Sequence, residues 1–417
     1  MENSKHKTQI MKFGFYGFLK NLRFFEPYLL YYFTIISGLT LFQVGILFSI
    51  REIIIYLFEI PSGVIADRYG KKTELVFCFV FYIFSFFVFF IATEYYMFII
   101  GMALFGFGEA FRSGTHKAMI MQYLDKNSIS TTKSKIYGQT RSMSLLGSMS
   151  MSIISIVFII WLPEIRYLFL LSIIPYILDL VLIITYPKYM NESESKEFKL
   201  KEFLKENYRS IKYTLTDKPV RKLLIEASSY QAAFKSIKDY IQPIIISISM
   251  GVIIFTGFTL EDNLKIYIGV IYAVIYFASS IASKNAHYIV KKFDNKKTIN
   301  AMWGLSGIIM IILAFFLNNI FMVFGIFLIL YIFLNIRRPL MVEQVGDASN
   351  PTKRASVLSV ESQITSLLVA VFAPILGFIA DRSMKWMFIL IGITMMVIFI
   401  FNLLFDKNKN KIKNDLV

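Results

Sequence analysis

Long apolar stretches separated by short polar connections run through the whole chain, and this alternation leaves few folds open to it. A helix that crosses a bilayer needs roughly 20 consecutive apolar residues. About twelve such stretches occur, near residues 22–40, 43–66, 74–93, 96–122, 136–160, 166–186, 221–250, 265–285, 298–317, 320–342, 355–380 and 385–405. Because 56% of the residues are hydrophobic and 17% are charged, a soluble surface could not cover them. The sequence therefore predicts an all-α integral membrane protein, multi-pass in the cell membrane and surrounded by the lipid bilayer.

Basic residues are distributed unevenly between the two sets of connections. Cytoplasmic loops of membrane proteins are enriched in Lys and Arg. If the N-terminus lies inside, the inner segments hold 35 of the 44 basic residues and the outer connections hold only 4. The first stretch follows several lysines and shows no small-residue cleavage site, so we expect an uncleaved first span and two cytoplasmic termini. This topology accounts for the net charge of +16, and nucleic acid is not an expected partner.

The longest polar stretch divides the chain into two halves. Residues 187–219 mix acidic and basic side chains and separate six predicted spans from six. We therefore expect an N-terminal six-helix bundle at residues 1–186, a cytoplasmic linker at 187–219 and a C-terminal six-helix bundle at 220–417. A Thr-Lys pair opens both the fifth and the eleventh span, which favours halves related by an internal repeat.

A charged motif follows the second predicted span, where residues 63–72 read GVIADRYGKK. A glycine at its start would let a neighbouring helix approach, and a glycine near its end would permit a tight turn between two closely linked spans. The motif resembles one that transporters of the major facilitator superfamily carry between spans two and three, Gly-x-x-x-Asp-Arg-x-Gly-Arg/Lys-Arg/Lys. All of its fixed positions are present, namely Gly63, Asp67, Arg68, Gly70, Lys71 and Lys72.

This resemblance implies two pseudo-symmetric six-helix bundles in a monomer that moves a small solute by alternating access. It also implies that Asp67 lies near the start of span eleven and helps to latch the halves together in the outward-facing state. In the family, spans three, six, nine and twelve form an outer support while the others line a central cavity. Two departures weaken an assignment to proton-coupled exporters. Met102 stands where drug–proton exchangers usually carry an arginine, and residues 146–150 read LGSMS in place of a Gly-Pro signature.

Ionisable side chains occur inside the predicted spans, where each costs about 2.5 kcal/mol or more on insertion. They concentrate in spans one, two, four, seven and ten, and among the predicted support spans only span six carries one in its interior, Asp179. This division agrees with the cavity-lining role that the resemblance implies. The candidate substrate-binding or proton-coupling residues are Glu26, Glu52, Glu59, Glu109, Arg112, His116 and Lys238.

At two of these candidate sites the charged residues could either form an ion pair within their helix or bind a substrate or proton. Glu109 and Arg112, three residues apart in span four, either bind a substrate or proton or neutralise each other within the helix. Lys235 and Asp239 have the i, i+4 spacing of an intrahelical pair, which would make Lys238 the better candidate for an unpaired cation.

For the remaining candidates the question is whether they exchange protons or have another role. His116, on the face of Glu109 and Arg112, either titrates near neutral pH or serves as a neutral hydrogen-bonding group. Glu26 precedes a proline and is a possible proton carrier, because burial disfavours its charged form. Arg51 is expected to lie too near the headgroups to pair with Glu52.

The sequence offers little for other kinds of chemistry. It has no Gly-rich phosphate cradle with its lysine, and its three histidines and single Cys78 make no plausible metal cluster, so we expect no enzyme, cofactor or metal site. We hypothesise a secondary transporter that exports drug-like or amphiphilic compounds, with protons as a candidate coupling ion. The alternative is an uptake carrier for a zwitterionic or anionic nutrient or metabolite. A non-transporting membrane sensor is the alternative from another class.

Overall fold

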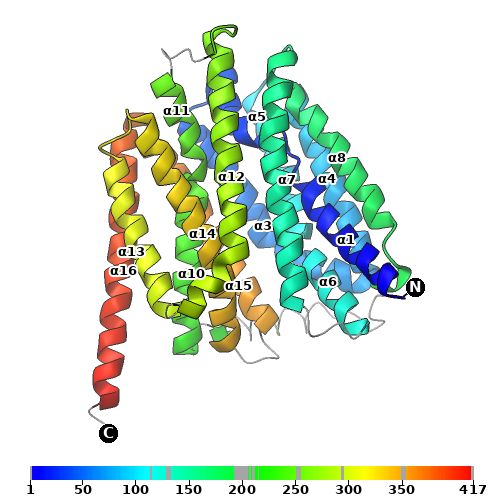
Figure 1. The fold of residues 1–417 in the computed structure, drawn as a ribbon, viewed down its shortest axis with the longest axis vertical. Helices are drawn as coiled ribbons and strands as arrows, with labels where there is room; N and C mark the ends of the chain where they lie inside the picture. Colours follow the sequence, from blue (N-terminus) through cyan, green and yellow to red (C-terminus); the bar gives the residue numbers. More distant parts are fainter. Residues whose placement is uncertain are drawn as a thin grey trace.

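The computed structural model describes residues 2–112, 115–127, 133–191, 216–249, 255–292, 295–348 and 354–414, together with Lys205, Tyr208 and residues 212–214. Within these ranges the chain forms helices and no strand. The long helices stand side by side, and both α1 and α16 have their terminal ends toward the lower end of the molecule (Figure 1). Eight of the described helices are long and apolar enough to cross a membrane, and the apolar part of α13 is shorter.

The first half of the chain forms α1 (Glu2–Lys20), η1 (Glu26–Tyr28), α2 (Leu29–Tyr31), η2 (Tyr32–Ile36), α3 (Leu41–Tyr69), α4 (Lys71–Ile91), α5 (Tyr95–Arg112), α6 (Thr115–Lys126), α7 (Lys133–Trp161), α8 (Tyr167–Ile184) and η4 (Lys188–Asn191). The second half forms α10 (Lys218–Ile237), η5 (Lys238–Tyr240), α11 (Ile241–Ser249), α12 (Leu260–Lys292), α13 (Asn295–Leu313), α14 (Ile320–Ala348), α15 (Arg354–Arg382) and α16 (Met384–Asn414). Each of the predicted spans two, three, five, six and eight to twelve therefore coincides with one long helix.

The first and seventh spans differ from the prediction, because each is broken. The helix expected at 22–40 begins instead at Glu2, stops at Lys20 and resumes only as the short turns η1, α2 and η2. The helix expected at 221–250 is interrupted by η5. A proline lies close to each break. Pro27 and Pro243 lack the N–H that would bond to the carbonyl four residues earlier, and their rings clash with that carbonyl, which weakens a helix near residues 23 and 239.

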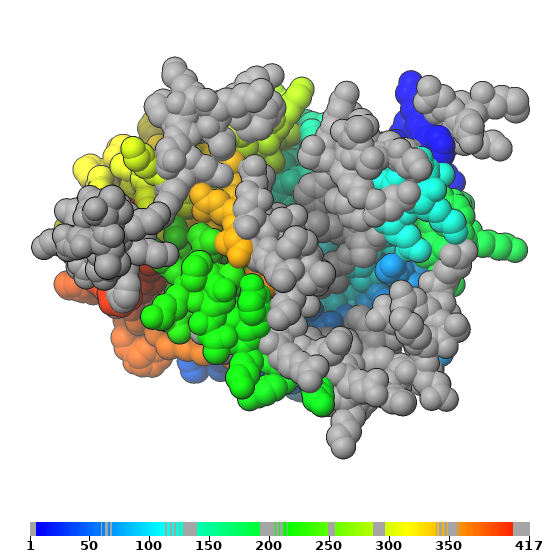
Figure 2. All heavy atoms as spheres, turned by 90° about the horizontal axis from the view of Figure 1, so that it is seen from below, coloured from blue at the N-terminus to red at the C-terminus, as the bar shows by residue number. Residues whose placement is uncertain are grey.

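The two halves meet along two seams, α3 against α15 and α7 against α12. Seen from the lower end, elements of the first half lie mostly to the right and elements of the second half mostly to the left (Figure 2). The α3–α15 seam is close because glycines face backbone. A Cβ at Gly45 would lie 2.5 Å from the Ala373 carbonyl oxygen, and a Cβ at Gly377 would collide with the Leu41 carbonyl.

The upper end of this seam is closed by a helix cap that one half supplies to the other. The carboxylate of Asp381, on the last turn of α15, accepts the backbone N–H groups of Leu41 (2.8 Å) and Phe42 (2.9 Å) at the start of α3. An acidic group is favourable at this position, because the first N–H groups of a helix lack partners within the helix. The cap fixes the upper ends of α3 and α15 against each other.

We predict that Gly377→Ala destabilises the protein. The added methyl group has to push apart two backbones in contact, and overpacking of this kind costs about 1–3 kcal/mol. Thermal unfolding of the purified protein in detergent measures the effect. Gly325→Ala on α14 is the matched control, because no atom lies within 4 Å of a Cβ placed there. The close-packed seam is contradicted if both variants unfold at the temperature of the unmodified chain.

Candidate functional site

The break in the first span is held in place by polar side chains of neighbouring helices. The Phe24 N–H donates to Ser172 Oγ on α8 (2.9 Å), and Ser155 Oγ on α7 donates to the Phe24 carbonyl (2.8 Å). The Tyr176 hydroxyl donates to the carbonyl of Lys20, the last residue of α1 (2.9 Å). Backbone groups inside a bilayer have no water to bind, and each unsatisfied group costs several kcal/mol. These partners therefore determine where the chain can leave the helix.

Gln242, beside the second break, joins it to the first broken span. Its Oε1 accepts the N–H groups of Leu30 (2.9 Å) and Tyr31 (3.1 Å), and its Nε2 donates to the Tyr272 hydroxyl (3.1 Å). Gln242 is fully buried. One amide side chain thus supplies the hydrogen bonds that the irregular part of the first span lacks, and it does so across the boundary between the halves.

Charged side chains gather around the two breaks. Arg23 lies within the first break and pairs with Glu26 (2.9 Å) and with Glu109 on α5 (3.5 Å). Arg112, one turn along α5, contacts the other oxygen of Glu109 (2.5 Å), and the Tyr82 hydroxyl donates to Glu109 as well (2.7 Å). Glu109 and Arg112 therefore do pair within their helix, but the first broken span supplies a second cation.

The second break extends this group of charges across the boundary between the halves. Lys238 Nζ lies 3.0 Å from Asp239 Oδ1 and 3.9 Å from Glu26 Oε1. We call the six residues the central charge cluster: Arg23, Glu26, Glu109, Arg112, Lys238 and Asp239. Three are basic and three acidic, so the formal charges cancel. Their side chains are 15% to 28% exposed, so water-sized molecules can reach a part of each.

A second ion pair crosses between the halves. Glu52 on α3 has a fully buried side chain, and it lies 2.9 Å from Arg51 and 2.7 Å from Lys235 on α10. The expectation that Arg51 lies too far out to pair is therefore wrong. The Arg51 guanidinium lies over the ring of Phe48, with 4.9 Å between the guanidinium carbon and the ring centroid, and this contact keeps it close to Glu52.

The expected pairing within span seven is also wrong. Lys235 pairs with Glu52 and not with Asp239, while Lys238, expected to be an unpaired cation, contacts Asp239 and Glu26. The i, i+4 rule assumes a continuous α-helix. Here α10 ends at Ile237 and a 3-10 turn follows, so residues 235 and 239 do not share a helical face.

His116 packs against aromatic side chains of the first half. Its ring stacks on Tyr16, with 3.6 Å between the ring centroids, and its Nε2 is hydrogen-bonded to the Tyr186 hydroxyl (3.1 Å). These contacts are those of a hydrogen-bonding group packed among the aromatic rings of the first half.

The remaining predicted residues lie on or beside α3. Glu59 is two turns along α3 from Glu52, while Gly63, Asp67 and Arg68 fall on its last turns, where placement of the side chains lies outside the described residues. Gly70 joins α3 to α4 with a φ of 91°, in the region that favours glycine. Lys71 Nζ donates to Gln122 on α6 (3.0 Å), and Lys72 Nζ donates to the carbonyls of Ile184 (2.5 Å) and Tyr186 (3.2 Å).

Sequence reasoning did not select Arg23, Lys235 or Asp239 as site residues. A signal shared by two of them is a proline four residues downstream, because the carbonyls of Arg23 and Asp239 cannot then accept the usual helical hydrogen bond. No local signal identifies Lys235, since its partner is 183 residues away. Over the ranges that are described, no group of three or more His, Cys, Asp or Glu residues could hold a metal ion.

Comparison with known proteins gives the family. The model of the Major Facilitator Superfamily matches residues 13–261 and 240–415. None of the curated proteins matches the sequence significantly.

Similar solved structures include the nucleoside transporter NupG, with 12% identity and a TM-score of 0.75 over 94% of this chain and 98% of that one. A POT family transporter in complex with 5-aminolevulinic acid has 16% identity and a TM-score of 0.75 over 96% of both chains. The peptide transporter POT in complex with sulfate has 12% identity and a TM-score of 0.74 over 96% and 94%. The family match covers nearly the whole sequence and the fold is that of solved transporters, so this chain belongs to the Major Facilitator Superfamily and is a multi-pass membrane transporter with the twelve-span, two-bundle architecture.

Proposed function

We propose that this transporter carries a small solute with one cationic and one anionic group, and that the solute binds at the central charge cluster. The observation that carries the proposal is the contact between Lys238 and Glu26. It joins the two broken spans, comes from both halves, and at 3.9 Å is the longest ion pair of the cluster. A zwitterion could replace this one long contact with two shorter ones, its cation at Glu26 and its anion at Lys238.

The balance of charge favours such a solute over a drug-like cation or an apolar compound. A buried charge that loses its partner is strongly destabilising. A solute that separated Lys238 from Glu26 without supplying both charges would leave each group with one ion-pair partner in place of two. A zwitterion would replace both lost contacts and leave the sum of charges at zero. Export of drug-like compounds rests on the resemblance alone, and the balanced charges of the cluster favour a zwitterionic solute.

We further propose that residues 1–186 and 220–417 are the units that move against each other, with residues 187–219 as a cytoplasmic linker. The contacts between the halves then fall into groups at different heights along the helices, and these groups could open at different stages of transport. The Asp381 cap lies at the upper end of the molecule, the Glu52–Lys235 and Glu26–Lys238 pairs lie around the breaks, and Arg141 donates to Asn335 (3.0 Å) between α7 and α14. Alternating access requires the upper and lower contacts to open in turn.

We predict that free amino acids or dipeptides raise the unfolding temperature of the purified transporter, while their N-acetyl and C-amide derivatives do not. A ligand that binds the folded state stabilises it by mass action, and each blocking group removes one charge that the cluster would bind. Thermal-shift measurements with matched free and blocked compounds test this directly. Equal shifts with both members of each pair, or no shift with any of them, would contradict a zwitterion site.

We predict that Glu26→Gln and Lys238→Gln each weaken binding of the stabilising compound by about 10-fold or more, because a hydrogen bond to a charged group contributes about 1.5–3 kcal/mol. Binding is measured by titration of the same thermal shift. Glu164→Gln is the matched control, since it removes an exposed carboxylate whose partner is Arg166 (2.7 Å), outside the cluster. Unchanged affinity in both cluster variants would remove these residues from the site.

We predict that Glu52→Gln lowers the free energy of unfolding by up to about 3 kcal/mol, because the guanidinium of Arg51 and the ammonium of Lys235, which are 15% and 35% exposed, lose the buried carboxylate between them. Lys235→Gln should cost less, since Arg51 still neutralises Glu52. Chemical denaturation of the purified variants gives both values. An equal loss in the two variants would show that Arg51 does not share the charge of Glu52.

A further inference from the structure

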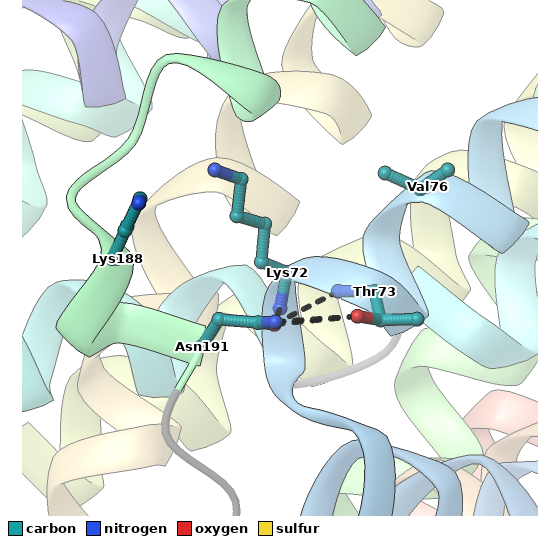
Figure 3. Close-up of a pocket in the computed structure, with 5 residues that line it drawn as sticks. All are labelled: Lys72, Thr73, Val76, Lys188 and Asn191. Carbon is teal, nitrogen blue, oxygen red and sulfur yellow. Dashed lines mark hydrogen bonds between the residues drawn. The ribbon is translucent and has the colours of Figure 1, made fainter.

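A hollow with basic walls lies away from the central charge cluster, where α4 begins and α8 ends. It has a volume of about 500 Å³ and is lined by Lys72, Thr73, Val76, Lys188 and Asn191. Figure 3 shows the side chains of Lys72 and Lys188 extending to the same side of this hollow, from α4 and η4 respectively. By the distribution of basic residues this end of the molecule is the cytoplasmic one.

More lysine ammonium groups lie around this hollow than the end of α8 uses as hydrogen-bond donors. Lys72 Nζ donates to the carbonyls of Ile184 and Tyr186, and Lys12 Nζ donates to Thr185 Oγ1 (2.9 Å), so two ammonium groups already serve the end of α8. Lys188 adds a third, and it repels Lys72 electrostatically. Among the described residues neither Lys72 nor Lys188 is paired with a carboxylate, so the hollow presents a positive charge that is not neutralised there.

The backbone donors of the α4 N-terminus are not part of this binding capacity. Asn191 Oδ1 already accepts the N–H groups of Lys72 (3.0 Å) and Thr73 (3.1 Å). Asn191 thus fixes η4 against α4 and holds Lys188 beside Lys72. An anion in the hollow would be bound by the two ammonium groups themselves.

The apolar surface next to the hollow decides which anion fits. Phe77 and Val80 on α4 and Val181 and Ile184 on α8 are each at least 36% exposed, on the helices that flank the hollow. These two helices pack against each other. Their outward side chains would contact acyl chains in a bilayer. A cationic hollow continuous with such a surface matches a molecule with an anionic head and apolar tails.

We infer that this hollow binds the phosphate of an anionic phospholipid in the cytoplasmic leaflet, between Lys72 and Lys188, with the acyl chains along α4 and α8. Basic pockets between transmembrane helices on the cytoplasmic side bind such headgroups. The site lies apart from the proposed solute site, so each can fail without the other. The bound lipid would tie η4, at the start of the 187–219 linker, to the membrane surface.

The test compares lipids and matched lysine variants of the full chain. Native mass spectrometry of the detergent-purified protein counts bound phosphatidylglycerol and phosphatidylcholine over a concentration series. We expect phosphatidylglycerol to bind more tightly than phosphatidylcholine. Lys188→Gln should weaken the binding of phosphatidylglycerol by about fivefold, because this is the contribution of one basic residue near an anionic lipid. Lys72→Gln/Lys188→Gln should remove the preference. Lys212→Gln, at an exposed position beyond η4, is the control and should bind like the unmodified chain.

Two further measurements keep the result unambiguous. Lys188→Arg keeps the positive charge and should retain the preference, which separates loss of charge from loss of folding. Inorganic phosphate added to the lipid-bound protein should displace phosphatidylglycerol poorly. Equal binding of the two lipids, an unchanged preference in Lys188→Gln and the double variant, or displacement of the lipid by millimolar phosphate would each overturn the proposal.

Discussion

A peptide group that leaves a helix inside a bilayer must find another hydrogen-bond partner, and the architecture of this transporter follows from how it meets that requirement. Pro27 and Pro243 open the first and seventh spans, at corresponding places in the two halves. Ser155, Ser172 and Gln242 then bind the backbone groups that are released. Because these side chains come from rigid neighbouring helices, the breaks have defined positions and the charges on them are held in place before any solute arrives.

The charges at the breaks are tolerated because they compensate one another. Within the central charge cluster cations and anions alternate from Arg112 through Glu109, Arg23 and Glu26 to Lys238 and Asp239. Only the Glu26–Lys238 contact connects the halves within this series, and it is the longest. A solute that takes over this contact would therefore act on an ion pair that joins the two bundles, which links binding to their relative movement.

Local patterns in the sequence predict most of the spans and the family, whereas contacts between distant segments cannot be predicted from such patterns. Apolar stretches near 20 residues predicted nine of the spans, because hydropathy alone requires them to cross the bilayer. The motif at residues 63–72 predicted the family, and Gly70 lies at the turn between α3 and α4 with a positive φ. The polar helix α1 was missed because its lysines resemble a cytoplasmic tail. The Glu52–Lys235 pair depends on how two distant helices pack, and no local pattern records that.

The central claim is that the charge cluster lines a water-accessible passage between the halves. The most direct measurement is the reaction of variants with one added cysteine, in intact membranes, with a membrane-impermeant, charged methanethiosulfonate reagent. The native Cys78 is buried and gives the background. The account predicts that Glu109→Cys and Asp239→Cys react from one side of the membrane and that Phe84→Cys, on the outward face of α4, does not. Failure of both cluster variants to react from either side would contradict it.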